Sequence, residues 1–520
     1  MHSPGGAPAS APLADVARKR FVINVGSNIG YVLLNTALMV WYVPFLVRHL
    51  GVAAYGMIAL ANALVAYAGI LTTSLDVSIS RFLAIDLNQG DAAGANRTFN
   101  TALWLSLAAC GILLPPLGIA TYFFPLLFNV PPGLALATQF LLASVGVTTL
   151  AAILSGSFGV SSLITHRFDL RNIVRSATSL SRAGLVALCF LFWPTSLWYV
   201  AAGFIVSACI GLAGDILIWR SLTPQLHIDR CNIDRHKFRD LIGLSGWSTI
   251  NQIGFLLLMQ TDLLIVNKMF DAEMTGLYGS VLLFPALIDT MTATVVTVLS
   301  PAIMAHFAIG DIVGMRRIAS RAVKLLGIGL ALPIGLLCGL GRPLLILWLG
   351  PRFAELDLLL ILLVGHMSVN LATRPLSYVL MAYNRVKVQG LVTLALGAVN
   401  VALAIAFVRW GGFGVRGVAA AAAIVWTIRN AVLLSSYASV LLRLPWSAFY
   451  PPLTAGALGT VSIALVSRFV SQLWWPASWM ALGVVATAIA AAYGVVAYAI
   501  SLNRSDRDLL FSLLHGGFHG

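Results

Sequence analysis

Charged residues are scarce in this sequence. Lys, Arg, Asp and Glu together make up 10% of its 520 residues, whereas hydrophobic residues make up 59%. A soluble domain carries about 25% charged residues, because its surface must stay hydrated. The composition therefore excludes an ordinary soluble protein and predicts a polytopic membrane protein.

Cysteine pairs and enzyme signatures are also missing. The five cysteines include no CxxC pair, so the sequence predicts neither a disulfide framework nor a zinc site. It contains no GxxxxGK[ST] phosphate loop, no HExxH and no GxSxG. We therefore expect a protein that is not an enzyme and that has no cofactor, apart from coupling to H+ or Na+.

Long hydrophobic runs are abundant instead. Fourteen runs are long enough to cross the roughly 30 Å of bilayer hydrocarbon, if some helices tilt. They cover residues 21–47, 53–75, 100–124, 136–160, 172–193, 198–219, 243–266, 277–303, 323–348, 357–381, 388–409, 416–441, 452–472 and 479–501. The pattern predicts an all-α membrane protein with about 14 transmembrane helices.

Acidic residues are the scarcer charge, with 18 Asp and Glu against 32 Lys and Arg. Lys and Arg gather in cytoplasmic loops, so their distribution orients the spans. With fourteen spans, one side holds 23 of these residues and the other holds seven, which predicts both termini in the cytoplasm. The basic residues lie in short loops, so we expect membrane lipids and not nucleic acid as partners.

The longest connection between runs divides the chain into two halves. We predict a disordered cytoplasmic tail at 1–20, an N-terminal six-helix bundle at 21–220, a cytoplasmic linker at 221–242, a C-terminal six-helix bundle at 243–442, an accessory helix pair at 443–501 and a cytoplasmic tail at 502–520. A weak repeat supports two pseudo-symmetric bundles, because a basic segment, a polar helix and a turn with Gly and Tyr recur about 220 residues apart.

The first span carries a polar stripe. Asn24, Asn28, Tyr31, Asn35 and Tyr42 follow steps of 4, 3, 4 and 7 residues, which place them on one helical face. Polar side chains in a membrane must bond to other helices or to water. The stripe fits either helix packing or the wall of a wet cavity, and its length favours the cavity, so we select the three asparagines as substrate-binding candidates.

The seventh span contains an acid in an apolar setting. Asp262 and Asn251 are eleven residues apart, and Ser248 lies one turn before Asn251, so all three share a face. An acid at this depth costs roughly 2.5–3.5 kcal/mol on insertion scales. Asp262 is either a packing acid satisfied by a neighbour or an ion-coupling residue.

The fifth span begins with three arginines. Arg171, Arg175 and Arg182 are spaced by 4 and 7 residues and therefore share a face. A basic collar at the membrane surface would explain the first two. Arg182 lies about three turns inside the run, where it either snorkels or binds an anion.

Two arginines lie deeper in the second half. Arg374, followed by Pro375, is in the tenth span, and Arg429 is in the middle of the twelfth. Buried guanidinium groups must pair with acids, such as Asp262 or Asp289, or face a cavity, and they bind phosphate in a bidentate manner. Arg374, Arg429 and Arg182 are thus our predicted substrate-binding arginines. Asp289 is a second ion-coupling candidate, and Asp215 is a weaker one.

Six motifs carry a family resemblance. They are RHLGVAAYGMIAL, LDVSISRF, DLLIVNKMFDAEMTGLYG, WLGPRF, LMAYNRVKVQG and GGFGVRGVAAAAAI, in that order. The chain resembles the polysaccharide-transporter branch of the multidrug/oligosaccharidyl-lipid/polysaccharide exporter superfamily, which includes Wzx-type O-antigen flippases. The resemblance implies twelve to fourteen spans, paired six-helix bundles, a cationic cavity and transfer of a polyprenyl-diphosphate-linked glycan to the outer leaflet.

We therefore expect an ion-coupled flippase of the bacterial inner membrane. Its cargo would be a lipid-linked O-antigen or exopolysaccharide repeat unit, moved by alternating access, and other membrane proteins of polysaccharide assembly would be its partners. A drug or metabolite antiporter of the same fold is the alternative, although a cationic interior disfavours cationic drugs. A membrane glycan polymerase or ligase would need a large external loop, and a structural scaffold would leave the buried charges unexplained.

Overall fold

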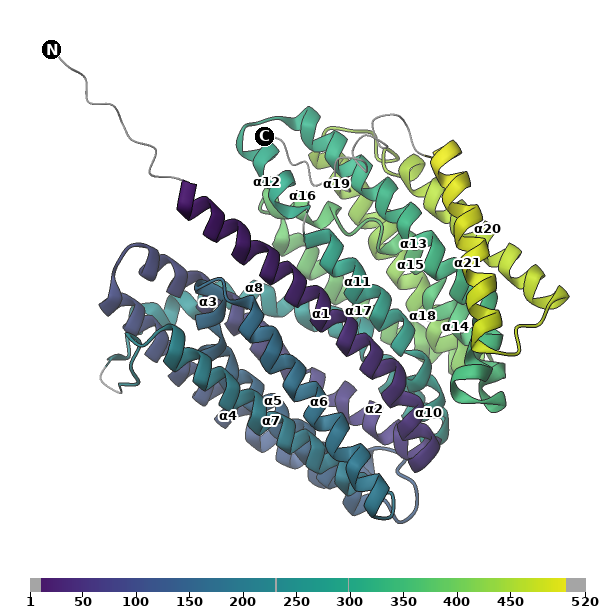
Figure 1. The fold of residues 1–520 in the computed structure, drawn as a ribbon, viewed down its shortest axis with the longest axis horizontal. Helices are drawn as coiled ribbons and strands as arrows, with labels where there is room; N and C mark the ends of the chain where they lie inside the picture. Colours follow the sequence, from purple (N-terminus) through teal and green to yellow (C-terminus); the bar gives the residue numbers. More distant parts are fainter. Residues whose placement is uncertain (1–10, 230–231, 298, 502–520) are drawn as a thin grey trace. The chain divides into compact units, whose positions relative to one another are not determined.

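The computed structural model describes residues 11–229, 232–297 and 299–501 (Figure 1). Within these ranges every regular element is a helix and there is no strand, which confirms the all-α prediction. The chain divides into two compact units, Met1–Thr249 and Ile250–Gly520. Each unit is described separately below.

The first unit is built around α5. Its helices are α1 (Ala11–Leu50), α2 (Val52–Ala66), α3 (Gly69–Asn88), α4 (Ala92–Leu127), α5 (Ala135–Ile164), α6 (Phe168–Phe192), α7 (Leu197–Leu222) and the first part of α8 (Arg235–Met259). Helix α5 packs against α2, α3, α4 and α7, while α6 packs against α1 and α7. Aromatic rings fill the core, where Phe99 stacks on Trp219 with a centroid distance of 5.4 Å.

The second unit is built around α13. Its helices are the end of α8, α9 (Thr261–Met269), α10 (Ala272–Val281), α11 (Leu283–Thr297), α12 (Ser300–Ala308), α13 (Ile312–Leu349), η2 (Pro351–Leu356), α14 (Asp357–Val364), α15 (Met367–Asn370), α16 (Leu376–Ala382), α17 (Val386–Arg409), α18 (Gly414–Thr427), η3 (Ile428–Leu434), α19 (Ser435–Leu441), α20 (Tyr450–Leu473), α21 (Trp479–Val496) and η4 (Ala497–Ser501). Helix α13 packs along α20 and against α14, and α17 packs against α18.

Several spans are interrupted. The described residues contain 12 helices that are long and apolar enough to cross a membrane, or 13 if the pair α8–α9, bent by 40°, is one span. The predicted count of fourteen is therefore not reproduced. The predicted span 53–75 is broken at Tyr67 and Ala68, which separate α2 from α3. The predicted span 357–381 is divided into α14, α15 and α16, and the second break includes Pro375.

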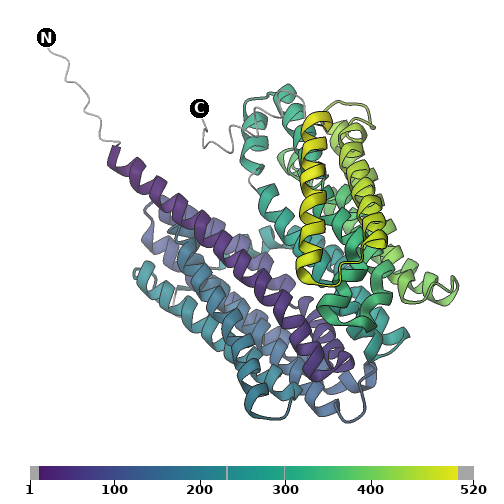
Figure 2. The ribbon, with the colours of Figure 1, turned by 45° about the vertical axis from the view of Figure 1, so that its right-hand side comes forward.

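Small residues bring α13 and α20 close together. A Cβ atom at Gly456 of α20 would lie 2.6 Å from the backbone carbonyl carbon of Gly327 on α13. One at Gly335 would lie 2.6 Å from the Cβ atom of Ile463. Close approach of this kind is the usual basis of helix packing in a membrane, where lipid is as apolar as the side chains. Figures 1 and 2 show α20 running beside α21 as well.

The internal repeat reappears in the turns. Asp91 caps α4 by accepting a hydrogen bond of 2.7 Å from the Gly94 amide, and Asp311, 220 positions later, caps α13 by accepting one of 2.8 Å from the Gly314 amide. The preceding residues, Gly90 and Gly310, have φ angles of 74° and 71°. In the second turn the Gly314 amide, and after it the His306 side chain, lower the pKa of Asp311. The repeat is thus visible in backbone geometry as well as in sequence.

The connection after α7 is bound to the first unit. We call residues 223–229 and 232–237 the linker strap. Asn100 of α4 donates a hydrogen bond of 2.8 Å to the carbonyl of His227 and accepts one of 2.8 Å from the Asp229 amide. Lys237 forms an ion pair of 2.7 Å with Asp86 of α3. The strap is therefore held in place along its length.

The predicted tails differ from the structure at one end. Helix α1 already begins at Ala11, inside the predicted tail 1–20, because Ala, Leu, Arg and Lys favour helix and Pro12 fits the first helical turn. Residues 1–10 and 502–520 lie outside the described part of the chain.

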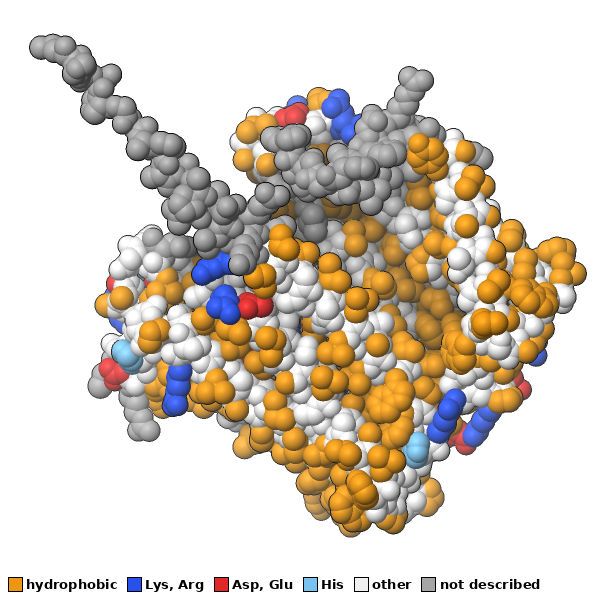
Figure 3. Space-filling model, in the orientation of Figure 1, with side chains coloured by type: hydrophobic (Ala, Val, Ile, Leu, Met, Phe, Trp, Pro, Cys, Tyr) orange, Lys and Arg blue, Asp and Glu red, His pale blue; other side chains and the backbone are white. Residues whose placement is uncertain are grey.

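Hydrophobic side chains dominate the face shown in Figure 3, as expected for a surface in contact with lipid.

Candidate functional site

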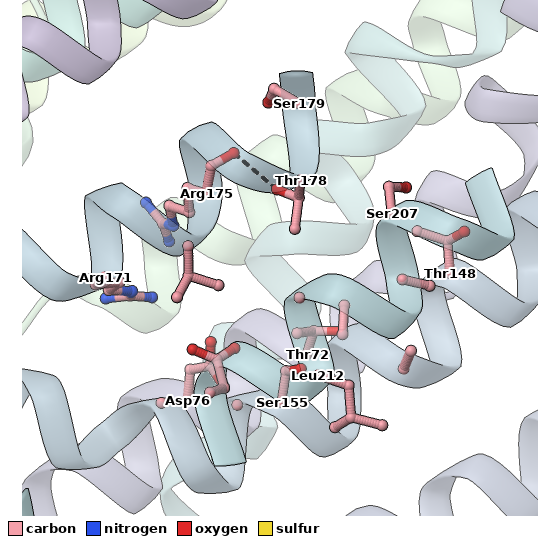
Figure 4. A pocket seen from close by; sticks show the side chains of 18 of the residues that line it. Thr72, Asp76, Thr148, Ser155, Arg171, Arg175, Thr178, Ser179, Ser207 and Leu212 are labelled. Carbon is pink, nitrogen blue, oxygen red and sulfur yellow. Dashed lines mark hydrogen bonds between the residues drawn. The ribbon is translucent and has the colours of Figure 1, made fainter. Parts of the chain in front are cut away.

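A polar cavity of about 330 Å³ lies among the helices of the first unit. Helices α3, α5, α6 and α7 line it, and Figure 4 shows Arg171 and Arg175 of α6 above Asp76 of α3. Its charged and hydroxyl-bearing lining residues are Thr72, Asp76, Thr148, Ser155, Arg171, Arg175, Thr178, Ser179, Arg182, Ser207 and Asp215. A cavity of this composition is suited to a charged ligand.

Helix α6 directs its three arginines into this cavity. Arg171, Arg175 and Arg182 all line it, so the shared face expected from their spacing is present. Large apolar residues of α6, among them Ile173 and Leu191, are exposed instead. The helix therefore separates an apolar surface from a strongly basic one.

The three guanidinium groups have no acceptor in the part of the chain that the structure describes. Among the described residues, none of them donates a hydrogen bond or forms an ion pair. Arg182 lies over the ring of Phe204 at 4.9 Å. Arg171 and Arg182 are partly buried and Arg175 is exposed, and guanidinium donors that line a cavity without acceptors among the described residues are ready to bind an anion.

Two acids share the cavity with the arginines. Asp215 enters from α7, where it interacts with Ser155 of α5, and Asp76 enters from α3. Arg171 interacts electrostatically with both acids. Asp215 is the weaker ion-coupling candidate predicted from the sequence, and Asp76 is not among the predicted residues. The available signal was an acid inside the mostly apolar run that becomes α3.

The polar stripe of α1 bonds to the first unit and does not line this cavity. The Asn24 amide donates a hydrogen bond of 2.8 Å to the carbonyl of His166, and Asn35 accepts one of 3.4 Å from Ser179. Asn28 is exposed. The contacts of Asn24 and Asn35 are those of helix packing, one of the two roles that the sequence allows for the stripe.

Arg374 lies in the second unit at the break before α16. Its Nη1 atom is 2.8 Å from Oδ1 of Asp289 on α11, so the two residues form an ion pair. The sequence selects Arg374 for substrate and Asp289 for ions, with an ion pair between them as the alternative. The structure shows that ion pair.

Arg429 lies in η3, a π-helical segment that continues α18. Its Nε atom donates a hydrogen bond of 3.0 Å to Thr393, and Nη1 donates one of 2.6 Å to Asn430. The guanidinium also lies over the ring of Trp426 at 5.4 Å. Segments of π-helix inside longer helices are frequent at functional sites.

Asp262 is buried at the first turn of α9, next to the bend at Gln260. Tyr278 donates a hydrogen bond of 2.9 Å to its Oδ2 atom. Oδ1 has no hydrogen-bond partner in the described residues, and neither has the amide of the buried Asn400 beside it. Asn251 also has an unpartnered buried oxygen, and the side chain of Ser248 lies outside the described part of the chain.

No group of three or more His, Cys, Asp and Glu side chains in the described ranges could hold a metal ion. The arrangement that remains is a helical membrane protein with a basic cavity in the first unit and a buried, partly unpartnered acid in the second. These features define a multi-pass membrane transporter. Comparison with known proteins gives its family.

Residues 21–308 match the family described as "Polysaccharide biosynthesis protein", and the chain belongs to that family. It is 29% identical to the uncharacterized membrane protein EpsK of Bacillus subtilis (strain 168), over 94% of this chain and 97% of that protein. It is 25% identical to a protein of Shigella flexneri named as a candidate O-antigen transporter, over 78% and 94% of the two chains.

Solved structures share the fold. The lipid II flippase MurJ in an inward closed conformation aligns with a TM-score of 0.65 at 14% identity, covering 94% of this chain and all of that chain. An inward-facing multidrug resistance transporter of the MATE family, in the MOP superfamily, aligns with a TM-score of 0.60, also at 14% identity, covering 87% and 99%. The fold is therefore that of MOP-type transporters, and the resemblance found in the sequence is confirmed.

Proposed function

We propose that this protein is a flippase that moves a polyprenyl-diphosphate-linked oligosaccharide, an O-antigen or exopolysaccharide repeat unit, across the bacterial inner membrane by alternating access. The observation that carries the proposal is the set of three arginines in the first-unit cavity, whose guanidinium groups have no acceptor among the described residues. Membership of the polysaccharide biosynthesis family supports the choice of cargo.

The diphosphate is the part of this cargo that needs a protein site. The polyprenyl tail can remain in the bilayer, but the charged head group must cross roughly 30 Å of hydrocarbon. Guanidinium groups replace the lost water with charge-assisted hydrogen bonds, often two per phosphate. The cavity, of about 330 Å³, is near the lower limit for small-molecule sites and suits the head group only.

The second unit supplies two further elements of the proposal. Arg374 and Arg429 are proposed phosphate contacts, and Arg374 would exchange its bond to Asp289 for one to the cargo. Asp262 is the proposed ion-coupling residue, because its Oδ1 atom and the adjacent Asn400 amide are buried without partners in the described residues. Asp289 would join it in ion coupling when Arg374 is released.

Loss of the gene tests the proposal directly. Deletion should cause lipid-linked repeat units to accumulate on the cytoplasmic side and should abolish the surface glycan, and the wild-type gene should restore export. Replacing Arg374 or Arg429 by Gln should impair export at normal protein levels, with Lys rescuing partly. Unchanged glycan export and no accumulated lipid-linked intermediate in the deletion strain would refute the function.

A drug or metabolite antiporter is the second candidate, because MATE transporters share the fold. The basic cavity repels the organic cations that such a transporter would have to bind. Efflux of a cationic dye from cells expressing this protein, with normal glycan export in the deletion strain, would favour this candidate.

A further inference from the structure

The two acids in the first-unit cavity are unexpected in a site for an anion. Asp76 and Asp215 lie with Arg171, Arg175 and Arg182 in one cavity. Three cations and two anions leave the empty site with one net positive charge when both acids are ionised. A diphosphate diester brings two negative charges, so it would reverse the sign of the site and place phosphate oxygens near two carboxylates.

Neither carboxylate can easily withdraw from the cavity. Asp215 lies against α5, where a Cβ atom at Gly159 would lie 3.4 Å from its Oδ1 atom. Asp76 also lies against α5, where a Cβ atom at Gly156 would meet its carboxylate. The charge of each acid can therefore be removed more readily by protonation than by movement.

The charged and titratable groups around the two acids come from few elements. Helix α6 contributes the three arginines, and α1 contributes Tyr31 and Tyr42, which interact with Arg171 and Arg182. The lining of α5 offers hydroxyl groups, and α4 contributes no described residue to the cavity. Among the described residues, Asp76 and Asp215 are thus the acids that face the arginines.

We propose that Asp76 and Asp215 form a proton site that fills when an anion of two charges binds the arginines of the same cavity. Each carboxylate takes up one proton from solution as phosphate oxygens bind the guanidinium groups with which it interacts electrostatically, and it loses that proton when the anion leaves. With both protons bound, the occupied site has the same net charge as the empty one. The identity of the anion rests on the proposed function, but the coupling does not.

Thermodynamic linkage between proton binding and anion binding gives the direction of the pH dependence. Because binding takes up protons, the affinity for the anion rises as the pH falls, and the bound anion raises the affinity for protons by the same factor. Each proton taken up changes Kd by about tenfold per pH unit where the acids are ionised in the free protein. A pair of acids therefore changes Kd by between about tenfold and a hundredfold per pH unit.

Calorimetry on the full-length protein in nanodiscs measures this coupling. The probe is farnesyl-diphosphate-linked N-acetylglucosamine, a diphosphate diester whose own charge is constant between pH 5 and pH 9. Titration in two buffers of different ionisation enthalpy counts the protons taken up. We expect between one and two protons for the wild type, fewer for D76N and for D215N, and close to none for the double variant, which should bind tightly at all pH values.

Three controls make the result decisive. E355Q removes an exposed acid far in sequence from the cavity and should leave the proton count unchanged. Size-exclusion profiles and thermal unfolding of the variants show whether they are folded, and the single variants carry the test if the double variant is not. Binding that depends on Na+ without proton uptake would overturn the proposal, as would an unchanged proton count in the double variant.

The same data separate this inference from the proposed function. Probe binding without proton uptake would refute the proton site and leave the flippase function standing. Proton-coupled binding to the purified protein, together with glycan export that does not require the gene, would refute the flippase function and leave the proton site standing. Failure of the probe to bind at any pH would overturn both.

Discussion

At the scale of single residues, the arginines of this protein differ in what surrounds them. Arg374 is paired with Asp289, and Arg429 donates hydrogen bonds to Thr393 and Asn430. Arg171, by contrast, has no acceptor among the described residues. A buried charge that is already satisfied contributes to packing, whereas an unsatisfied one is costly unless a ligand completes it. The unsatisfied group is therefore the better indicator of a binding site.

Replacement of Arg171 by Gln should reduce glycan export by about 10- to 100-fold at normal protein level. Hydrogen bonds to charged groups contribute about 1.5–3 kcal/mol, and 1.4 kcal/mol corresponds to tenfold in affinity. R171K should keep part of the activity, because Lys retains the charge but not the bidentate geometry. The measurement is surface glycan per cell against protein abundance. R409Q, an exposed arginine at the end of α17, serves as the matched control, and equal loss in both variants would contradict the site.

Replacement of Asp262 by Asn should reduce transport and leave expression intact. The amide oxygen of Asn can still accept the hydrogen bond from Tyr278, so the packing around α9 survives while the negative charge is lost. Transport assays across a range of pH and sodium concentration give the measurement. Activity equal to wild type under all these conditions would show that Asp262 only packs.

At the scale of elements, the seam between α13 and α20 depends on the absence of side chains. G456L would drive a side chain into the backbone of Gly327, and we expect a loss of about 1–3 kcal/mol in stability, the usual cost of overpacking. Thermal unfolding of the purified protein measures it. G483L on α21 is the control, since a Cβ atom there meets nothing within 4 Å, and equal destabilisation by both would argue against the seam.

The helices could be predicted from hydrophobic runs, but of their interruptions only the one at Pro375 could. A run of apolar residues gives the length available for a span, and it says little about the bend at Gln260 or the break at Tyr67, where no proline stands. The site shows the same limit. The spacing of Arg171 and Arg175 predicted a shared face. The sequence offered Asp262 and Asp289 as partners of Arg374, and the choice of Asp289, 85 positions away, depends on tertiary structure.

At the scale of the whole molecule, the balance of Lys and Arg predicts the orientation in the membrane. Reporter fusions after Gly90, Ile233 and Asn503 should all report the cytoplasm, and a fusion after Glu273 should report the opposite side. The physical reason is the uneven distribution of Lys and Arg, because the fourteen predicted spans leave 23 of them on one side of the membrane and seven on the other. A periplasmic signal at Ile233 would contradict the predicted topology.

The linker strap has a mechanical consequence. A free chain of its predicted length, 22 residues, would let its ends wander over roughly 25 Å, and it would act as a slack tether between the two units. Here the chain is bound to α4 by Asn100 before α8 begins, and Lys237 binds the first turn of α8 to α3, so little of that slack remains. The covalent link that remains is a continuous helix, which resists bending. The boundary between the two units, at Thr249 and Ile250, therefore lies inside a helix and not in a loose loop.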